Sequence, residues 1–230
     1  MASMGKHPRL LAGLVALLVT QPLLAYGGLA TRILFDGMFA AVLLGVVFVI
    51  FGAGWERKLA LVLVLPVFVL YLAHYLLPDR MRFASALLYN ALIIAFIGLA
   101  IAVTLRDILQ KRVIGGGDVL GAVSGYILGG IVWGNLYVVL HLLAPGSFAV
   151  QPEIAWQLQE RHLLHALFNF FSFATLTSLG YNDITPITPF ANTLTWLEVM
   201  FGQFYLAVVV AQLVGMRLAQ AIQPGGPESK

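Results

Sequence analysis

A short polar run near the C-terminal end of the chain contains the residue types that could handle ions. It reads Ser-Phe-Ala-Thr-Leu-Thr-Ser-Leu-Gly-Tyr-Asn-Asp over residues 172–183 and lies between two long apolar segments. A dehydrated cation needs oxygen ligands in place of water, and a chain supplies them densely by turning successive carbonyl groups the same way. That arrangement requires unusual backbone angles at alternate residues. Glycine adopts positive φ freely and asparagine tolerates it, and Gly180 and Asn182 stand at alternate positions.

The residues between these two positions fit the same interpretation. Leu179 and Tyr181 are expected to point away from the axis of the loop and to wedge it against the segment before it. Inside a bilayer, backbone that is not helical must be buried in protein or must line a water-filled path. The run is therefore predicted to line such a path.

The overall composition places the chain in a membrane. Of its 230 residues, 60% are hydrophobic and 10% are charged, and its mean hydropathy is +0.93, whereas about a quarter of the residues of a soluble domain are charged. The chain has no cysteine, which excludes disulfides and thiolate chemistry. We also find no nucleophile elbow, paired catalytic carboxylates or metalloprotease motif. We therefore expect neither an enzyme nor a cofactor, and no nucleic-acid partner.

Six apolar segments are long enough, or nearly so, for the roughly 20 residues that a spanning helix needs. They are residues 10–30, 33–53, 59–77, 83–105, 119–143 and 190–214. A seventh segment, residues 161–177, is too short to span and fits a re-entrant helix that leads into the polar run. The predicted fold class is an all-α integral membrane protein with six transmembrane helices, one re-entrant helix and its loop.

The cationic residues of the connections favour one orientation. With a cytoplasmic N-terminus, nine Lys and Arg residues lie inside and four outside, as the positive-inside rule prefers. Both termini are then cytoplasmic, the protein is a multi-pass protein of the cell (inner) membrane, and the polar run opens outward. Residues 1–30 also resemble a cleaved signal peptide in their charge pattern, and this alternative leaves the downstream orientation unchanged.

The chain divides into three parts by composition. Residues 1–113 form a four-helix transmembrane domain, residues 118–218 form a second domain with the polar run, and residues 219–230 form a short cytoplasmic tail. The fourth span contains no Lys or Arg within residues 83–105. Voltage sensing by a charged helix needs several such residues within the membrane, so we do not expect it. In the fifth span, glycines recur at residues 117, 121, 125 and 129, which predicts a groove for the last helix or a neighbouring subunit.

The polar run resembles the signature of tetrameric potassium channels, Thr-x-Thr-Thr-Val-Gly-Tyr-Gly-Asp. Residues 175–183 read Thr-Leu-Thr-Ser-Leu-Gly-Tyr-Asn-Asp. The likeness extends backwards to Phe170-Phe171 and forwards through Ile184-Thr185-Pro186, and it is greatest to small bacterial ion-channel proteins. It covers residues 118–218. One such loop cannot surround an ion, so the chain must form an oligomer, and the resemblance implies a homotetramer.

The resemblance also implies roles for individual residues. The selectivity filter would be Ser178, Leu179, Gly180, Tyr181 and Asn182, with potassium bound at the first four. Support for the filter would come from Phe170, Phe171, Thr175, Thr177, Asp183 and Glu198, the last an ionisable residue at membrane depth. The inner helix would have its hinge at Gly202 and would line the pore with Gln203, Leu206, Val210 and Val214.

The filter departs from the family pattern at three positions, since Ser-Leu-Gly-Tyr-Asn stands in place of Thr-Val-Gly-Tyr-Gly. Asn182 is the largest change, because it adds an amide at the outer mouth. We expect a potassium-preferring channel that conducts passively, with membrane lipids and its own copies as partners. The alternatives are a weakly selective or inactivated channel and a non-conducting scaffold or sensor with a channel-like fold. The sequence predicts no gating stimulus.

Overall fold

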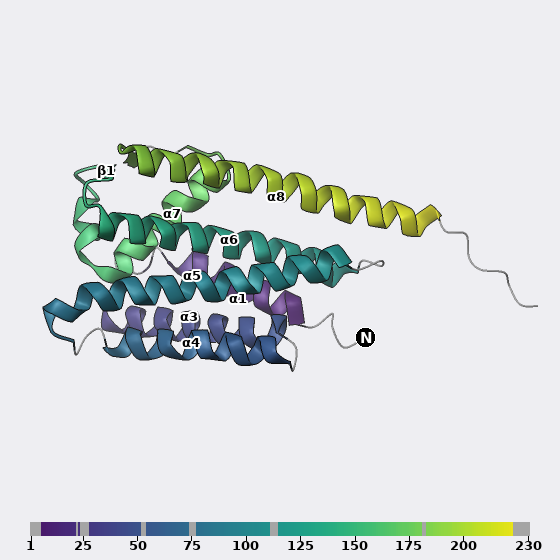
Figure 1. Ribbon diagram of the computed structural model, residues 1–230, viewed down its shortest axis with the longest axis horizontal. Coiled ribbons are helices and arrows are strands. Elements are labelled where there is room, and N and C mark those ends of the chain that lie inside the picture. Colours follow the sequence, from purple (N-terminus) through teal and green to yellow (C-terminus); the bar gives the residue numbers. More distant parts are fainter. Residues whose placement is uncertain are drawn as a thin grey trace, which may run out of the picture.

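The chain, described here from a computed structural model, is a bundle of helices with one small sheet. The structure describes residues 6–21, 23, 28–51, 54–73, 77–110, 115–180 and 183–222. The elements in order are α1 (Lys6–Thr20), α3 (Leu29–Ile50), α4 (Trp55–Ala73), α5 (Asp79–Gln110), α6 (Gly116–Leu143), β1 (Phe148–Val150), the 3-10 helix η1 (Ala155–Gln159), α7 (Arg161–Leu176), β2 (Ile184–Pro186) and α8 (Pro189–Ile222). The long helices run along one common direction, and α1 begins at the end of the bundle at which α8 ends (Figure 1).

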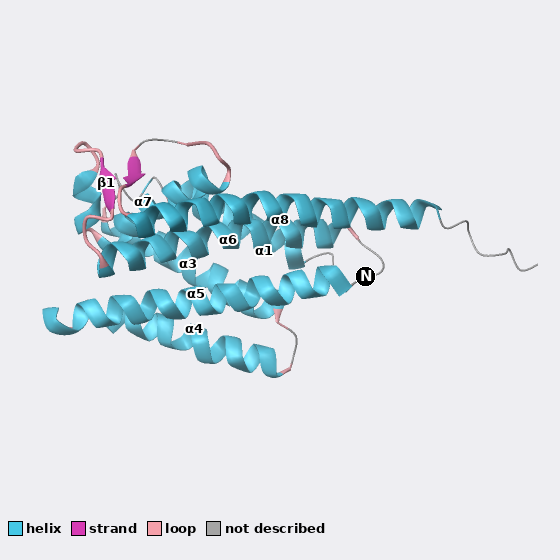
Figure 2. Cartoon of the chain, turned by 45° about the horizontal axis from the view of Figure 1, so that its top comes forward, coloured by secondary structure: helices cyan, strands magenta, loops and turns pink. Residues whose placement is uncertain are grey.

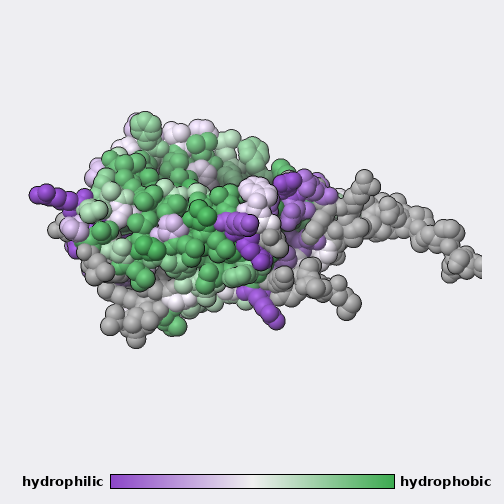
Figure 3. Space-filling view, turned by 60° about the horizontal axis from the view of Figure 1, so that its bottom comes forward, coloured by the Kyte–Doolittle hydropathy of each residue, from purple (hydrophilic) through white to green (hydrophobic). Residues whose placement is uncertain are grey.

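Three helices of the described part are long and apolar enough to cross a membrane. Their spanning stretches are Arg80–Ile108 of α5, Gly116–Leu143 of α6 and Pro189–Met216 of α8. The helices α1, α3 and α4 overlap the segments predicted as the first three spans, and each begins four residues before its predicted segment. The total of six spans stays a prediction. Apolar residues cover most of the face in Figure 3, and hydrophilic residues gather mainly toward its ends.

The N-terminal helices pack on α6 of the same chain. A buried apolar cluster joins α1, α3, α4 and α5 to α6, with Leu14, Val46, Val64, Phe96 and Leu128 at its centre. Burial of side chains of this size stabilises a fold by about 1.5–3 kcal/mol each. Within one chain, α6 is therefore the helix on which both halves of the bundle are built.

The glycine groove of α6 receives large side chains of α8 and α7. A methyl group at Gly125 would lie 2.5 Å from the Tyr205 hydroxyl, and one at Gly129 would lie 2.9 Å from the Phe201 ring. Further along α6, Gly130 faces Phe173 of α7. At Gly125 and Gly129 the predicted seam against the last helix is confirmed, although aromatic rings rather than backbone fill the groove. Gly121 faces His7 of α1 instead.

The chain is mostly helical, as predicted, and a small two-stranded sheet that the sequence did not indicate adds to the helices. Strands β1 and β2 pair antiparallel, with Ala149 opposite Thr185, at the end of the bundle near α7 (Figure 2). Two more backbone bonds extend the pairing, from Gln151 N to Asp183 O at 3.1 Å and from Ile187 N to Ser147 O at 3.0 Å. Each strand has three residues, too few for an alternation pattern to be seen in the sequence. The sheet holds the chain directly after the predicted filter.

Candidate pore-loop site

The short helix α7 begins where the re-entrant helix was predicted to begin and ends one residue earlier. It packs against α6 and α8 through an aromatic cluster. Phe171 is buried, with its ring 4.9 Å from that of Tyr137 and 5.9 Å from that of Phe148. Phe170, predicted to support the filter beside it, is 47% exposed. The chain thus holds α7 by one side and leaves the side with Phe170 open.

The backbone turns sharply directly after α7. Ser178 N donates to Thr175 O at 2.9 Å and Leu179 N donates to Ala174 O at 2.7 Å. Gly180 has the predicted positive φ, 72°. Ser178 has a φ of 57°, which the sequence did not indicate, and it is the one non-glycine residue of the described part with positive φ. Left-handed backbone therefore alternates at two positions of the predicted filter.

The remaining filter residues are partly outside the described chain. Tyr181 and Asn182 lie outside the described residues, so their predicted roles stay predictions. Leu179 is 63% exposed within one chain. Asp183 is half-buried, and its carbonyl oxygen accepts the bond from Gln151. Asp183 thus anchors the loop end to the sheet through its backbone.

Within the described residues, a hydrogen bond joins the predicted filter to the predicted pore lining. Gln203 Nε2 of α8 donates a hydrogen bond to Ser178 Oγ at 3.2 Å. Leu206, Val210 and Val214 follow Gln203 along α8, and all three are exposed in the single chain. The structure therefore brings Ser178 to the end of an exposed stripe of α8, the arrangement that a pore lining needs.

Two threonines at the end of α7 are held in different ways. Thr175 is buried and its carbonyl accepts from Ser178 N. Thr177 is exposed, and its hydroxyl donates to the carbonyl of Phe173 at 2.6 Å. Both stabilise the turn from α7 into the loop.

Glu198 is fully buried where three helices meet. The Tyr137 hydroxyl of α6 and the Ser172 hydroxyl of α7 both donate to its carboxyl group. Ser172 Oγ also lies 2.7 Å from the carbonyl oxygen of Gly130 on α6. Buried polar groups need such partners, because an unmade bond costs their full desolvation. Glu198 therefore links α8 to both α6 and α7.

Sequence reasoning missed the two partners of Glu198. Ser172 begins the polar run, but the sequence does not show which helix its side chain faces. Tyr126 and Tyr137 are 11 residues apart on α6, close to three helical turns, so they share a face. Two tyrosines on one face of a glycine-rich span are the signal that could have indicated hydrogen bonding toward α7 and α8.

The C-terminal end of α7 rests on α6 and α8 at one carbonyl. The oxygen of Leu176 accepts a hydrogen bond from the Tyr126 hydroxyl at 3.1 Å. A methyl group at Gly202 would lie 2.5 Å from the same oxygen. Helix α8 continues without a break through Gly202, so the predicted hinge stays a prediction. In this structure the glycine allows α8 to approach α7 closely.

The substitution Tyr126→Phe is expected to lower the free energy of unfolding by about 1 kcal/mol, because it removes the donor to Leu176 O. Tyr205→Phe is the matched control, since the Tyr205 hydroxyl donates to Ala122 O of α6 at 2.7 Å rather than to α7. Both variants should lose similar stability in detergent unfolding. Only the change at residue 126 should alter ion flux, and equal flux changes in the two variants would contradict a role of this bond at the loop.

The comparisons with known proteins agree with this geometry. Residues 147–217 match the model of a family described as "Ion channel". That stretch contains the small sheet, α7, the loop and most of α8. No curated protein and no solved structure matches the chain. Fold, site and family match together support a membrane protein of the pore-loop ion-channel class.

Proposed function

We infer that the chain is the subunit of a homotetrameric, potassium-preferring cation channel. It has six spans and one re-entrant pore loop per subunit, lies in the inner membrane with both termini in the cytoplasm, and conducts passively. It needs no cofactor besides the permeant ion, catalyses no reaction and binds membrane lipids and its own copies rather than nucleic acid. The observation that carries the proposal is the bond between Gln203 and Ser178, which aligns the loop with the exposed stripe of α8.

Exposure along α7 and α8 supports assembly into an oligomer. Large apolar side chains on these helices are uncovered in one chain, namely Phe170, Phe190, Trp196 and Phe204. The loop itself is exposed at Leu179, and one loop cannot enclose an ion. Four copies around one axis would bring four loops together and cover part of this surface.

The proposed potassium preference is based on the sequence of the loop, and the proposed absence of a charged voltage-sensing helix is based on the sequence of α5. Gly180 and Tyr181 keep the family pattern, Ser178 keeps a hydroxyl group and Leu179 an apolar side chain, so carbonyl coordination of a dehydrated cation is expected there. Helix α5 has no Lys or Arg within residues 83–105, and Arg106 lies beyond them, 3.9 Å from Glu56. A charged helix of the voltage-sensing kind is therefore not part of the proposal.

Ion flux into liposomes tests the proposal directly. Purified protein should carry potassium into vesicles, barium should block it, and sodium should enter more slowly. Equal rates for the two ions would identify a weakly selective channel and remove the claim of potassium preference. A complete lack of flux would favour a non-conducting scaffold.

The substitution Gly180→Ala is expected to reduce potassium flux at least about tenfold. A side chain at its φ of 72° costs roughly 1–2 kcal/mol, and the backbone can relieve that strain by leaving the conducting geometry. Gly146→Ala is the matched control, because Gly146 has a φ of 87° and open space around it. The two variants should be similarly destabilised in thermal unfolding, and only the first should lose flux. Similar flux losses in both would contradict the assignment of Gly180 to the filter.

A further inference from the structure

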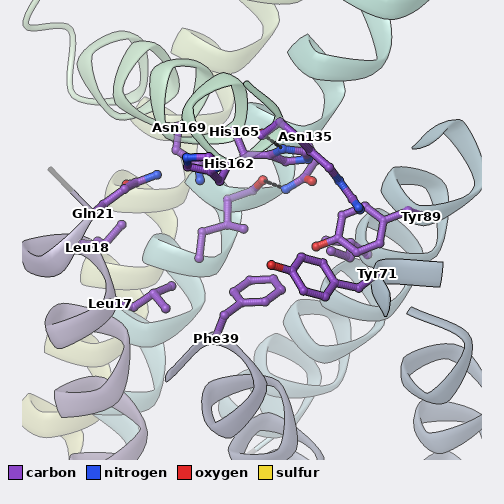
Figure 4. A pocket seen from close by; sticks show the side chains of 13 residues that line it. Leu17, Leu18, Gln21, Phe39, Tyr71, Tyr89, Asn135, His162, His165 and Asn169 are labelled. Atoms are coloured by element: carbon purple, nitrogen blue, oxygen red, sulfur yellow. Dashed lines mark hydrogen bonds between the residues drawn. The ribbon is translucent and has the colours of Figure 1, made fainter. Parts of the chain in front are cut away.

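A pocket with a cationic and aromatic wall lies where the N-terminal helices meet α7. Its lining comes from α1, α3, α4, α5, α6 and α7. Figure 4 shows His162, His165, Asn169 and Asn135 along one side, with Tyr71 and Tyr89 on another. Leu17 and Leu18 of α1, Phe39 of α3 and Ile93 of α5 supply apolar surface. None of these residues belongs to the filter or to the pore stripe of α8.

Arg161, the first residue of α7, places a cation in this pocket. Its guanidinium group lies 4.4 Å from the centre of the Tyr89 ring and 5.1 Å from that of Tyr71. The two rings stabilise the cation, but they are not conventional acceptors for its N–H groups. Its Nη1 atom is buried and has no hydrogen-bond partner among the described residues. The 16-residue helix α7 also begins here, and helix N-termini attract anions.

Asn135 of α6 adds an acceptor to the same pocket. Its side chain is 3% exposed, and its Nδ2 donates to the Ile131 carbonyl oxygen at 2.7 Å. This bond fixes the orientation of the amide, because only the nitrogen can donate to a carbonyl. The Oδ1 atom is then a buried acceptor without a partner among the described residues. Buried polar atoms are nearly always paired, so Oδ1 points to a ligand that donates a proton.

The neighbouring His165 is already used within the protein. Its Nδ1 lies 2.8 Å from the Arg161 carbonyl oxygen and its Nε2 lies 3.1 Å from Asn90 Oδ1. The contact with Asn90 ties α7 to α5 beside the pocket. The pocket therefore contains a buried guanidinium nitrogen, Arg161 Nη1, that can donate and a buried amide oxygen, Asn135 Oδ1, that can accept.

We propose that this pocket binds an amphiphilic oxyanion that also carries a hydroxyl group. The anionic oxygen accepts from Arg161 Nη1, the hydroxyl donates to Asn135 Oδ1, and the apolar part lies along Leu17, Leu18 and Phe39. Two sources share this chemistry, a hydroxylated anionic phospholipid and a small soluble hydroxy-phosphate. The site is separate from conduction and does not rest on the proposed channel activity.

The test measures binding to the purified full-length protein in detergent by native mass spectrometry. The probes are phosphatidylglycerol, phosphatidic acid and phosphatidylcholine with identical acyl chains, and glycerol phosphate alone. Phosphatidylglycerol should bind at least about tenfold more tightly than phosphatidylcholine, which has no net negative charge for Arg161. Phosphatidic acid should bind with an affinity between the two, because it lacks the headgroup hydroxyl for Asn135. Glycerol phosphate binding as tightly as the lipid would identify the soluble source. Equal binding of the three lipids, with no binding of glycerol phosphate, would overturn the proposal.

Variants separate this pocket from general attraction to anionic lipid. Arg161→Gln should weaken phosphatidylglycerol binding about tenfold. In the wild-type protein we expect phosphatidylglycerol to bind roughly fivefold more tightly than phosphatidic acid, and Asn135→Leu should remove this difference. Arg80→Gln is the charge-matched control, because Arg80 is exposed near the start of α5, and it should leave binding unchanged. Asn135→Leu leaves the cation in place, so it tests the site even if the arginine variant does not fold. Wild-type lipid preference in the Asn135 variant, or equal losses at Arg80 and Arg161, would overturn the assignment.

Discussion

Replacing Glu198 with alanine is expected to lower the free energy of unfolding by about 3–5 kcal/mol and to abolish ion flux. The change removes the acceptor of the buried Tyr137 hydroxyl group and one of the two acceptors within reach of the Ser172 hydroxyl, which keeps the Gly130 carbonyl oxygen. A buried donor left unsatisfied costs roughly 1–3 kcal/mol. It also leaves a cavity at a fully buried position. Because these bonds join α8 to α6 and α7, the loop above them should lose its fixed position. Detergent unfolding and liposome flux measure the two effects.

Two further variants define what the carboxyl group does. Glu198→Gln keeps the volume and one acceptor, so we expect a loss of about 1–2 kcal/mol. Glu153→Ala removes an exposed carboxylate and should change stability by less than about 0.5 kcal/mol. The double variant Glu198→Ala with Tyr137→Phe should lose less free energy of unfolding than the sum of the two single variants, because both changes remove the same hydrogen bond. Full additivity, or a loss at Glu198 as small as at Glu153, would contradict the proposed link between helices.

The features that sequence reasoning predicted well are those encoded locally. Helix α7 corresponds to a segment that is too short to cross a bilayer, so its length alone predicted a re-entrant helix. The positive φ of Gly180 follows from the residue type, and the glycine spacing in α6 predicts a close seam. The spacing of Leu206, Val210 and Val214 is also local information, because the helical period alone places the three residues on one face of α8.

The features that sequence reasoning missed depend on pairs of distant residues. Tyr137 and Glu198 are 61 residues apart, and Tyr126 and Leu176 are 50 apart. A single sequence carries no signal for such pairing, because many arrangements of the same helices satisfy its pattern. The sequence predicted no partner for Arg161, whereas the structure places its guanidinium group over the rings of two tyrosines. The φ of Ser178 was missed because nothing in its residue type requires it.

The substitution Gly202→Ala is expected to lower the free energy of unfolding by about 3 kcal/mol and to reduce potassium flux strongly. The added methyl group would lie 2.5 Å from the Leu176 carbonyl oxygen and 3.1 Å from the Leu176 side chain. Backbone cannot move aside as a flexible side chain does, so the end of α7 must shift away from α8. Since the loop begins two residues after Leu176, the shift displaces Ser178 from Gln203. Unfolding in detergent and flux into liposomes measure both consequences.

A second glycine of the same helix distinguishes close contact from hinge motion. Gly215 has no atom within 4 Å of an added methyl group, so Gly215→Ala should gain up to about 1 kcal/mol from helix propensity. If residue 202 acts only as a hinge, alanine there should gain similar stability and change only how often the pore opens. If it acts as the contact on which α7 rests, stability and flux fall together. The measured sign of the stability change at residue 202, relative to that at residue 215, therefore decides between the two roles.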